Sequence, residues 1–435
     1  MGKRRRSHVR SRPREAAETS RSVYHQVLCN QSLALALLQF QDGVYFPLLP
    51  RYRAWSRAFL DGSLRAPTLQ QELHLNSKTD PRYILHRAIF DNDISAVRQL
   101  HKCRSTIFTD DALHLAASCG HLELSKELRS LGYGVTSPRV MDFAAAGGHL
   151  DICVFFKDLP STSAAIDNAA TQGHLEIVQL LNSLGNHEAT TQAMDGAVQN
   201  KHFSVVQYLH AERSEGCTPA AMDGAALNGD LAMVTFLHSH RTEGCTTEAM
   251  DAAATHGFLS IVQFLHSNRT EGCTTRAMNN AATSGYLDVV QFLHEYRAEG
   301  CTRQAMDGAA TNGHLKVVTF LHTHRREGAT HRAMDGAAQN GHLAVVKYLT
   351  EHRLATSRSE TMELACHYGH LKIVRYLHEQ GCACDFAAME EAIIHGHIQI
   401  VKYLHSHRMV RVTKNMVRLA MDSQHHKIVQ YLRRR

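Results

Sequence analysis

The sequence predicts an all-α protein, a helical repeat solenoid of about 12–13 helix–turn–helix units behind an N-terminal helical cap. One residue position, usually Gly, recurs before the second helix of each unit. Most intervals between these marks are 28 residues, and the intervals 148–173 and 369–396 are shorter. Only 8 of the 435 residues are proline, which favours helices. Such a period indicates an array of units that contact only their neighbours. The marks are Asn92, Gly120, Gly148, Gly173, Lys201, Gly229, Gly257, Gly285, Gly313, Gly341, Gly369, Gly396 and Gln424.

Each unit opens with a residue that can cap a helix. A Thr, Ser or Asp stands eleven residues before most marks, and its side-chain oxygen can accept a hydrogen bond from the first helical turn. Pro219 follows Thr218 at the first helical position, where proline fits. Arg358 interrupts the pattern. We therefore expect a short first helix of small residues, with Met or Leu seven residues before the mark.

The mark predicts the end of that helix, because glycine adopts the left-handed cap conformation without steric cost. Asn92 is the next best residue, whereas Lys201 and Gln424 predict strained or differently built turns. A second helix should follow, with apolar residues at +2, +4, +5, +7 and +8 from the mark and often an aromatic residue at +7. This broad apolar surface predicts a helix packed between neighbours on both sides.

The two ends of the chain differ from the repeats. Seven Lys or Arg and no acidic residue occur in the first fourteen residues, so we expect residues 1–21 to be a basic, disordered tail. Residues 22–80 do not repeat and predict a helical capping region. The solenoid should occupy residues 81–432 and be followed by the basic tail 433–435.

Charge and hydropathy restrict the class of protein. Without residues 1–14 and 433–435 the chain has 37 basic and 41 acidic residues, which is not a basic, nucleic-acid-like surface. No apolar run approaches the roughly 20 residues that span a bilayer. The basic N-terminus lacks the apolar core of a secretory signal. We expect no membrane association and a cytoplasmic protein, or a nuclear one if residues 1–14 act as an import signal.

The second repeat carries a family resemblance. Residues 111–123 read Asp-Ala-Leu-His-Leu-Ala-Ala-Ser-Cys-Gly-His-Leu-Glu, and later units keep Ala-Ala-x-x-Gly-His-Leu, as in 309–315. This pattern resembles the ankyrin repeat over about four fifths of the chain. The ankyrin unit is near 33 residues, and this one is 28. The resemblance therefore implies short or absent β-hairpin fingers between units.

His, Cys and Asp are common in catalytic sites, and they are abundant here. They recur in nearly every unit, however, whereas a catalytic nucleophile or base occurs once, in an environment set by its neighbours. The periodicity therefore argues against catalysis. Neighbouring helical units lie roughly 8–10 Å apart, too far for disulfides or shared zinc ligands along a ladder. We predict no catalytic, cofactor-binding or metal site, and reduced thiols. The cysteine ladder is Cys217, Cys245, Cys273 and Cys301, and the histidine pairs that could bind metal adventitiously are His238/His240, His322/His324 and His405/His407.

Three other ladders predict structural contacts. Arg and Glu recur together in the connections, from Arg213 and Glu215 onward, and predict inter-unit ion pairs on a solvated edge. Asp replaces the ankyrin-type His of the first helix, as at Asp251, and is expected to bond backbone N–H groups of a neighbouring unit. His residues such as His238 end the second helix and are expected to bond its terminal carbonyls.

Positions that vary between repeated units are the candidates for recognition. In the ankyrin architecture that the chain resembles, the two residues before each mark open onto the concave face, although free variation in solvent is the alternative. Residues near the start of the first helix, such as Glu248 and Arg276, vary too. The predicted partner-binding residues are Leu227, Asn228, Thr255, His256, Thr283, Ser284, Thr311, Asn312, Gln339, Asn340, His367 and Tyr368.

These observations predict a non-enzymatic protein–protein interaction scaffold or adaptor, monomeric, that recognises a protein partner through the concave solenoid face. One alternative is a substrate-recognition adaptor of a degradation complex, acting through residues 22–80. Another is a nucleic-acid-associated nuclear protein that acts through its basic tails. No motif identifies the partner.

Overall fold

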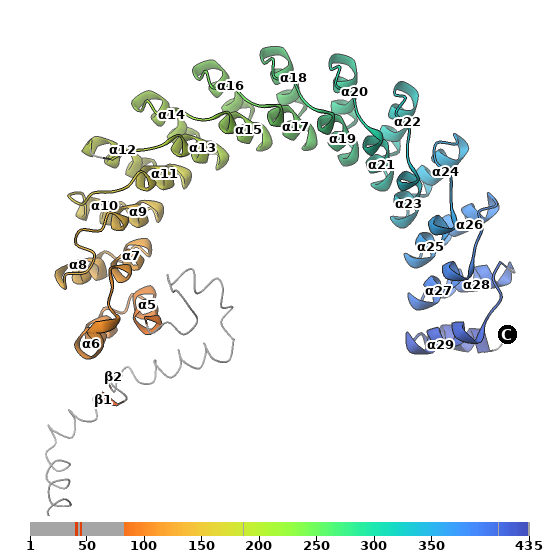
Figure 1. Cartoon of the computed structure of the whole chain (residues 1–435), viewed down its shortest axis with the longest axis horizontal. Helices are drawn as coiled ribbons and strands as arrows, with labels where there is room; N and C mark the ends of the chain where they lie inside the picture. Colours follow the sequence, from red (N-terminus) through yellow and green to blue (C-terminus); the bar gives the residue numbers. More distant parts are fainter. Residues whose placement is uncertain (1–39, 42–43, 46–81, 186, 408, 434–435) are drawn as a thin grey trace, which may run out of the picture. The chain divides into compact units, whose positions relative to one another are not determined.

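The computed structural model describes residues 40–41, 44–45, 82–185, 187–407 and 409–433. They belong to two compact units, Met1–Ala193 and Met194–Arg435. The basic tail 1–21 and most of the capping region 22–80 lie outside the described residues. From residue 82 onward, the described chain is built of helices (Figure 1).

The described residues of the first compact unit form one short hairpin and four helix pairs. Strand β1 (Phe40–Gln41) pairs antiparallel with β2 (Val44–Tyr45), and Phe40 lies opposite Tyr45. The helices are α5 (Tyr83–Phe90), α6 (Ile94–Arg104), η2 (Ser105–Ile107), α7 (Asp110–Ser118), α8 (Leu122–Ser130), α9 (Arg139–Ala146), α10 (Leu150–Phe155), α11 (Ala164–Thr171) and α12 (Leu175–Leu184).

The second compact unit continues the same pattern, and α13 crosses its boundary. Its helices are α13 (Thr191–Gln199), α14 (Phe203–Glu212), α15 (Pro219–Leu227), α16 (Leu231–His240), α17 (Thr247–Thr255), α18 (Leu259–Asn268), α19 (Thr275–Ser284), α20 (Leu287–Tyr296), α21 (Arg303–Thr311), α22 (Leu315–His324), α23 (His331–Gln339), α24 (Leu343–Glu351), α25 (Ser359–His367), α26 (Leu371–Glu379), α27 (Phe386–Ile394), α28 (Ile398–Ser406), α29 (Lys414–Asp422) and α30 (His426–Arg433).

Successive helices alternate between two rows. Within each compact unit, first helices pack on their own second helix and on the first helix of the next repeat, as α17 packs on α18 and α19. Within the second compact unit, the odd-numbered helices form the inner row of a curve and the even-numbered helices form the outer row (Figure 1). The described connections between repeats contain no strand, so the expected loss of the β-hairpin fingers is confirmed.

The predicted caps and marks determine where the first helices begin and end. The Oγ1 atom of Thr246 accepts the Glu248 N–H at 3.1 Å, and Thr218, Thr274, Thr302 and Thr330 do the same in their repeats. The glycine marks have positive φ, as at Gly257 (76°). Asn92, Lys201 and Gln424 adopt this left-handed conformation too, at 55°, 64° and 61°, so the non-glycine turns are built alike and carry the strain.

The core of each repeat combines small side chains of the first helix with branched apolar side chains of the second helix. In the repeat of α17 and α18, the buried residues include Ala253 and Ala254 of the first helix and Ile261, Val262 and Leu265 of the second. Alanine lets neighbouring helix backbones approach closely, and the apolar residues at +4, +5 and +8 close the core. The apolar residues at +2 and +7 are only half-buried.

The shorter spacing at 148–173 has a visible cause. Helix α10 has six residues where its equivalents in the second compact unit have eight to ten, and Phe156 is completely buried just beyond its end. The shorter repeat therefore has a shorter second helix, and the row of first helices continues without a gap.

Candidate partner-binding surface

The inner row is held in register by the predicted aspartates. Asp251, 1% exposed, accepts the Thr274 backbone N–H at 2.8 Å and the Thr274 hydroxyl at 2.6 Å. In the first compact unit, Asp142 holds Thr162 of the next repeat in the same way. The expectation that this ladder bonds neighbouring backbone groups is confirmed, and it makes the aspartates structural.

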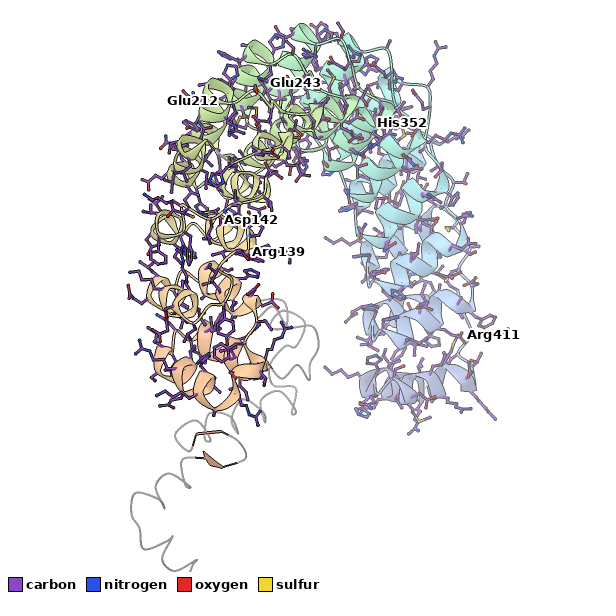
Figure 2. The ribbon with its side chains drawn as sticks, turned by 60° about the vertical axis from the view of Figure 1, so that its left-hand side comes forward. Arg139, Asp142, Glu212, Glu243, His352 and Arg411 are labelled. Carbon is purple, nitrogen blue, oxygen red and sulfur yellow. The ribbon has the colours of Figure 1, made fainter. Side chains whose placement is uncertain are left out.

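The charged ladder of the connections is arranged differently from the prediction. The ion pairs form within one connection: Arg241 pairs with Glu243, two residues away. The expected inter-unit ion pair is therefore wrong for this ladder. The link between repeats is a hydrogen bond instead, because Glu243 Oε1 accepts the Cys217 N–H at 3.1 Å. Glu243 lies in the connection that follows α16 (Figure 2).

The recurring cysteines are packed beside these pairs and are unreactive. Burial raises the pKa of the thiols of Cys217 and Cys273 to about 12 and that of Cys245 to about 11, with the nearby glutamates as the next cause. All three are free thiols. A protonated, buried thiol is a poor nucleophile and a poor metal ligand, which agrees with their structural assignment.

The histidines that end the second helices do not bond the terminal carbonyls as predicted. His238 meets the Phe264 ring of the next repeat edge-on, with centroids 5.5 Å apart, and its Nδ1 is buried without a hydrogen-bond partner. The side chains of His240, His324 and His407 do bond helical carbonyls, four residues earlier in their own helices. The two histidines of each pair noted in the sequence therefore have different contacts: the first meets an aromatic ring of the next repeat, and the second bonds a carbonyl of its own helix.

The twelve predicted partner-binding residues lie where the inner helices end. Five of the six pairs comprise the last residue of a first helix and its C-terminal cap, as with Leu227 and Asn228 at the end of α15. Thr283 and Ser284 are the last two residues of α19, whose cap is Gly285. Within the second compact unit this places them along one row, at one end of the odd-numbered helices (Figure 1).

Several of the twelve have internal partners. The hydroxyls of Thr255, Thr283 and Thr311 donate to carbonyls four residues earlier in their own helices. The amides of Asn228, Asn312 and Asn340 donate to carbonyls of the preceding repeat, at 2.6, 2.8 and 2.9 Å. Gln339 contacts the Tyr368 hydroxyl at 3.3 Å, and His367 bonds Glu391. These contacts buttress the row.

Other members of the twelve have exposed side chains. Leu227 is 50% exposed and Tyr368 is 47% exposed, and His256 and Ser284 are also exposed. Single exposed apolar side chains are common on protein surfaces, and Leu227 and Tyr368 are two of them in separate repeats of one row. The exposed members are therefore the part of the row that is available to a partner.

A pocket of about 640 Å³ opens beside Leu227. It lies among α13, α15 and α17, where the carboxylates of Asp223 and Glu248 supply negative charge. A Cβ on Gly224 of α15 would lie 3.1 Å from Gln199 Cγ, so the glycine fits closely against α13. The sequence prediction contained Leu227 and Asn228 but not Gly224 or Asp223. The position of Gly224 varies between repeats, which is the signal that could have drawn attention to it, whereas Asp223 belongs to the aspartate ladder. The lining comprises Gln199, Asn200, Ala220, Asp223, Gly224, Leu227, Asn228, Glu248 and Ala252.

Comparisons with known proteins agree with the repeat architecture. A family model described as ankyrin repeats (3 copies) matches residues 307–386, and one described as ankyrin repeats (many copies) matches residues 273–322. No curated protein matches the chain. Among the described helices, none combines the length and apolarity that crossing a bilayer requires.

Solved structures of another helical repeat protein are also similar. The pentatricopeptide repeat protein PPR10 in complex with an 18-nt psaJ RNA element has 12% identity and a TM-score of 0.43, with 97% of this chain and 72% of that chain covered. The structure of PPR10 from maize has 12% identity and a TM-score of 0.29, with 98% and 76% covered. The family models thus identify ankyrin repeats within residues 273–386.

Proposed function

We propose that the chain is a non-enzymatic scaffold that binds a protein partner through the inner row of its second compact unit. The ankyrin repeats support a repeat-based binding role. The observation that carries the choice of surface is the pocket among α13, α15 and α17, with the exposed Leu227 at its edge. The remaining exposed members of the row extend the contact along later repeats.

The pocket has a definite chemical character. Leu227 offers apolar area, and Ala220 and Ala252 add small apolar side chains to the lining. Asp223 and Glu248 place two carboxylates in the lining, although Thr246 and Arg276 already contact them. An extended segment with an apolar anchor flanked by Lys or Arg would fit this combination.

The experiment is quantitative affinity purification from cells that express the full chain. We expect replacement of Leu227, His256 and Tyr368 together by Ala to reduce the captured partner at least tenfold, by removing apolar anchors from the row. Tyr296→Ala is the matched control, because Tyr296 is 52% exposed at the end of α20 in the outer row. Circular dichroism should be the same for all three proteins.

Equal loss of partner in the Tyr296 control, or undiminished capture by the triple variant, would contradict this proposal. The degradation-adaptor and nucleic-acid alternatives place their determinants in residues 22–80 and in the basic tails. Deletion of residues 1–14 would abolish a strongly salt-dependent affinity in the nucleic-acid alternative, and leaves the proposed protein contact unchanged.

A further inference from the structure

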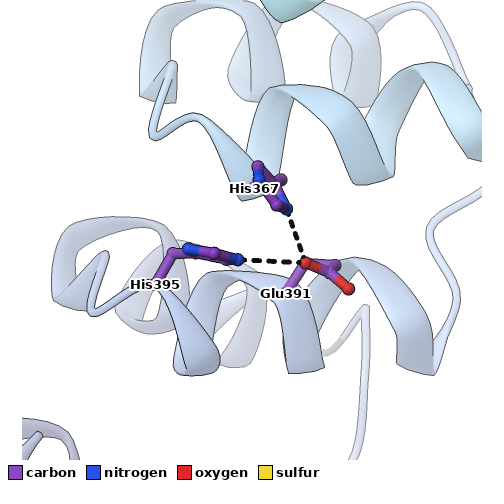
Figure 3. Close-up of side chains that lie close together, drawn as sticks. All are labelled: His367, Glu391 and His395. Atoms are coloured by element: carbon purple, nitrogen blue, oxygen red, sulfur yellow. Dashed lines mark hydrogen bonds and ion pairs between the residues drawn. The ribbon is translucent and has the colours of Figure 1, made fainter. Parts of the chain in front are cut away.

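Three metal-ligating side chains converge near the C-terminal end of the inner row. His367 is the last residue of α25, Glu391 lies in α27, and His395 caps the end of α27 (Figure 3). His367 Nδ1 lies 2.7 Å from Glu391 Oε2, and His395 Nε2 lies 3.5 Å from the same oxygen. The three ligand atoms all lie within 4.8 Å of one another.

This cluster departs from the repeat pattern around it. The residue two before each mark faces the residue five before the mark of the next repeat. At two equivalent contacts Thr283 meets Gly308 and Thr311 meets Gly336, and at a third the Asn280 amide donates to the Thr255 hydroxyl at 3.0 Å. Here a histidine faces Glu391, and His395 supplies a second imidazole from the following turn. The contact is thus chemically richer than the repeat architecture requires.

We propose that His367, Glu391 and His395 bind one divalent transition-metal ion of the zinc class. Two imidazoles and a carboxylate form a ligand set that suits zinc, whereas magnesium and calcium prefer oxygen ligands alone. Tetrahedral zinc holds its nitrogen and oxygen ligands about 2.0–2.1 Å away, and so about 3.3 Å from one another. The 2.7 Å and 3.5 Å separations bracket that spacing, so modest side-chain movements complete the site.

The bound ion joins two neighbouring repeats. His367 comes from one repeat, and Glu391 and His395 come from the next, so the ion cross-links α25 to α27. The His367, Glu391 and His395 side chains are 35%, 35% and 40% exposed, which leaves the remaining coordination positions open to water. Binding to the folded chain then raises the thermal stability of this part of the array by mass action.

A hydrogen bond between His367 and Glu391 without any metal is the competing interpretation. Glu391→Gln separates the two, because the amide oxygen still accepts a hydrogen bond from His367 but is a poor metal ligand. His395→Ala removes a ligand that takes no part in the 2.7 Å bond. His240→Ala is the matched control, since His240 is exposed and bonds the Phe236 carbonyl in another repeat.

The experiment uses the full chain, stripped of metal with EDTA and kept reduced, at pH 7.5. Calorimetric titration with Zn²⁺ measures stoichiometry and affinity, and Co²⁺ absorption reports the coordination geometry. We expect wild type and His240→Ala to bind one more equivalent of Zn²⁺ than Glu391→Gln and His395→Ala do. The Zn²⁺-dependent rise in melting temperature should likewise disappear in the two site variants.

Background binding by the other histidines and cysteines is shared by wild type and the two site variants, so the difference between them carries the result, and His240→Ala shows what the loss of a histidine outside the site does. Equal stoichiometry and affinity in all four would overturn the proposal, as would a wild type that binds no Zn²⁺. Unchanged melting temperatures of the metal-free variants would show that they fold. The outcome is independent of the partner-binding experiment, which leaves these three residues unchanged.

Discussion

At the scale of single residues, one hydroxyl decides whether the Nδ1 atom of a recurring histidine has a hydrogen-bond partner. His322 Nδ1 contacts the Tyr348 hydroxyl at 2.9 Å, and His378 and His405 contact Tyr403 and Tyr431 in the same way. Where the next repeat carries Phe, the histidine Nδ1 is buried without a hydrogen-bond partner, as in His238. The ring geometry is nearly the same, with centroids 5.7 Å apart for His322 and Tyr348 and 5.5 Å apart for His238 and Phe264.

Phe264→Tyr should therefore stabilise the protein, because its hydroxyl would reach the buried Nδ1 of His238. We expect the free energy of unfolding to rise by about 1 kcal/mol, the usual net worth of a hydrogen bond. Urea denaturation of the variant and wild type measures the change. Tyr348→Phe is the reciprocal control and should lose a similar amount. A Phe264→Tyr variant no more stable than wild type would show that the hydroxyl does not reach Nδ1.

At the scale of the repeat element, the glycine mark has two functions. It adopts a positive φ, and it leaves room for the residue that follows the next mark. A Cβ on Gly257 would lie 2.5 Å from the ring of Tyr286, and one on Gly229 would lie 2.6 Å from the ring of Phe258. In the second compact unit, Lys201 is the non-glycine mark that another repeat follows, and there the aromatic residue is replaced by Asp230.

Gly257→Ala and Lys201→Gly should consequently change stability in opposite directions. The first adds backbone strain and a clash with Tyr286, and we expect it to lower the free energy of unfolding by about 2–4 kcal/mol. The second relieves left-handed strain at a position with a small neighbour, and should raise it by about 0.5–1 kcal/mol after the added entropy of the unfolded chain. Urea midpoints measure both, and a destabilised Lys201→Gly would contradict the strain argument.

At the scale of the whole molecule, the Arg–Glu pairs of the second compact unit predict sensitivity to acid. Hydrogen bonding to Arg269 lowers the pKa of Glu271 from 4.5 to about 2, against an opposing effect of burial. The same direction holds at Glu215 and Glu327, where the arginine is again the largest cause. At Glu243 and Glu299 burial is the largest single effect and raises the pKa, but hydrogen bonds outweigh it.

A lowered pKa means that the folded state prefers the charged carboxylate. Its stabilisation is complete above about pH 4.5 and is lost as the pH falls toward about 2. We expect the urea midpoint of wild type to fall through this window and that of Glu271→Gln to fall less steeply. The comparison removes the contributions of all other groups. Parallel pH profiles would show that this pair contributes no pH-dependent stability.

Much of the fold was predictable because the repeat multiplies each local signal. A Thr cap, a small-residue helix, a Gly and an apolar helix recur in register, so the helix pairs and the missing fingers could be predicted from residues such as Thr246 and Gly257. The candidate surface was predictable only in part. Leu227 and Tyr368 are exposed as expected. The Asn312 amide instead bonds a carbonyl of the preceding repeat, and the Thr311 hydroxyl bonds a carbonyl of its own helix. No sequence pattern shows such backbone partners.

The sequence by itself determined the helical array, its period and the structural nature of the aspartate and cysteine ladders, since these depend on local conformation and on contacts repeated many times. Tertiary structure alone decided which variable residues are exposed, and where a pocket opens beside Leu227. It also brought His367, Glu391 and His395 together across two repeats. Such singular contacts depend on side-chain directions between helices, and a periodic pattern carries no information about a feature that occurs once.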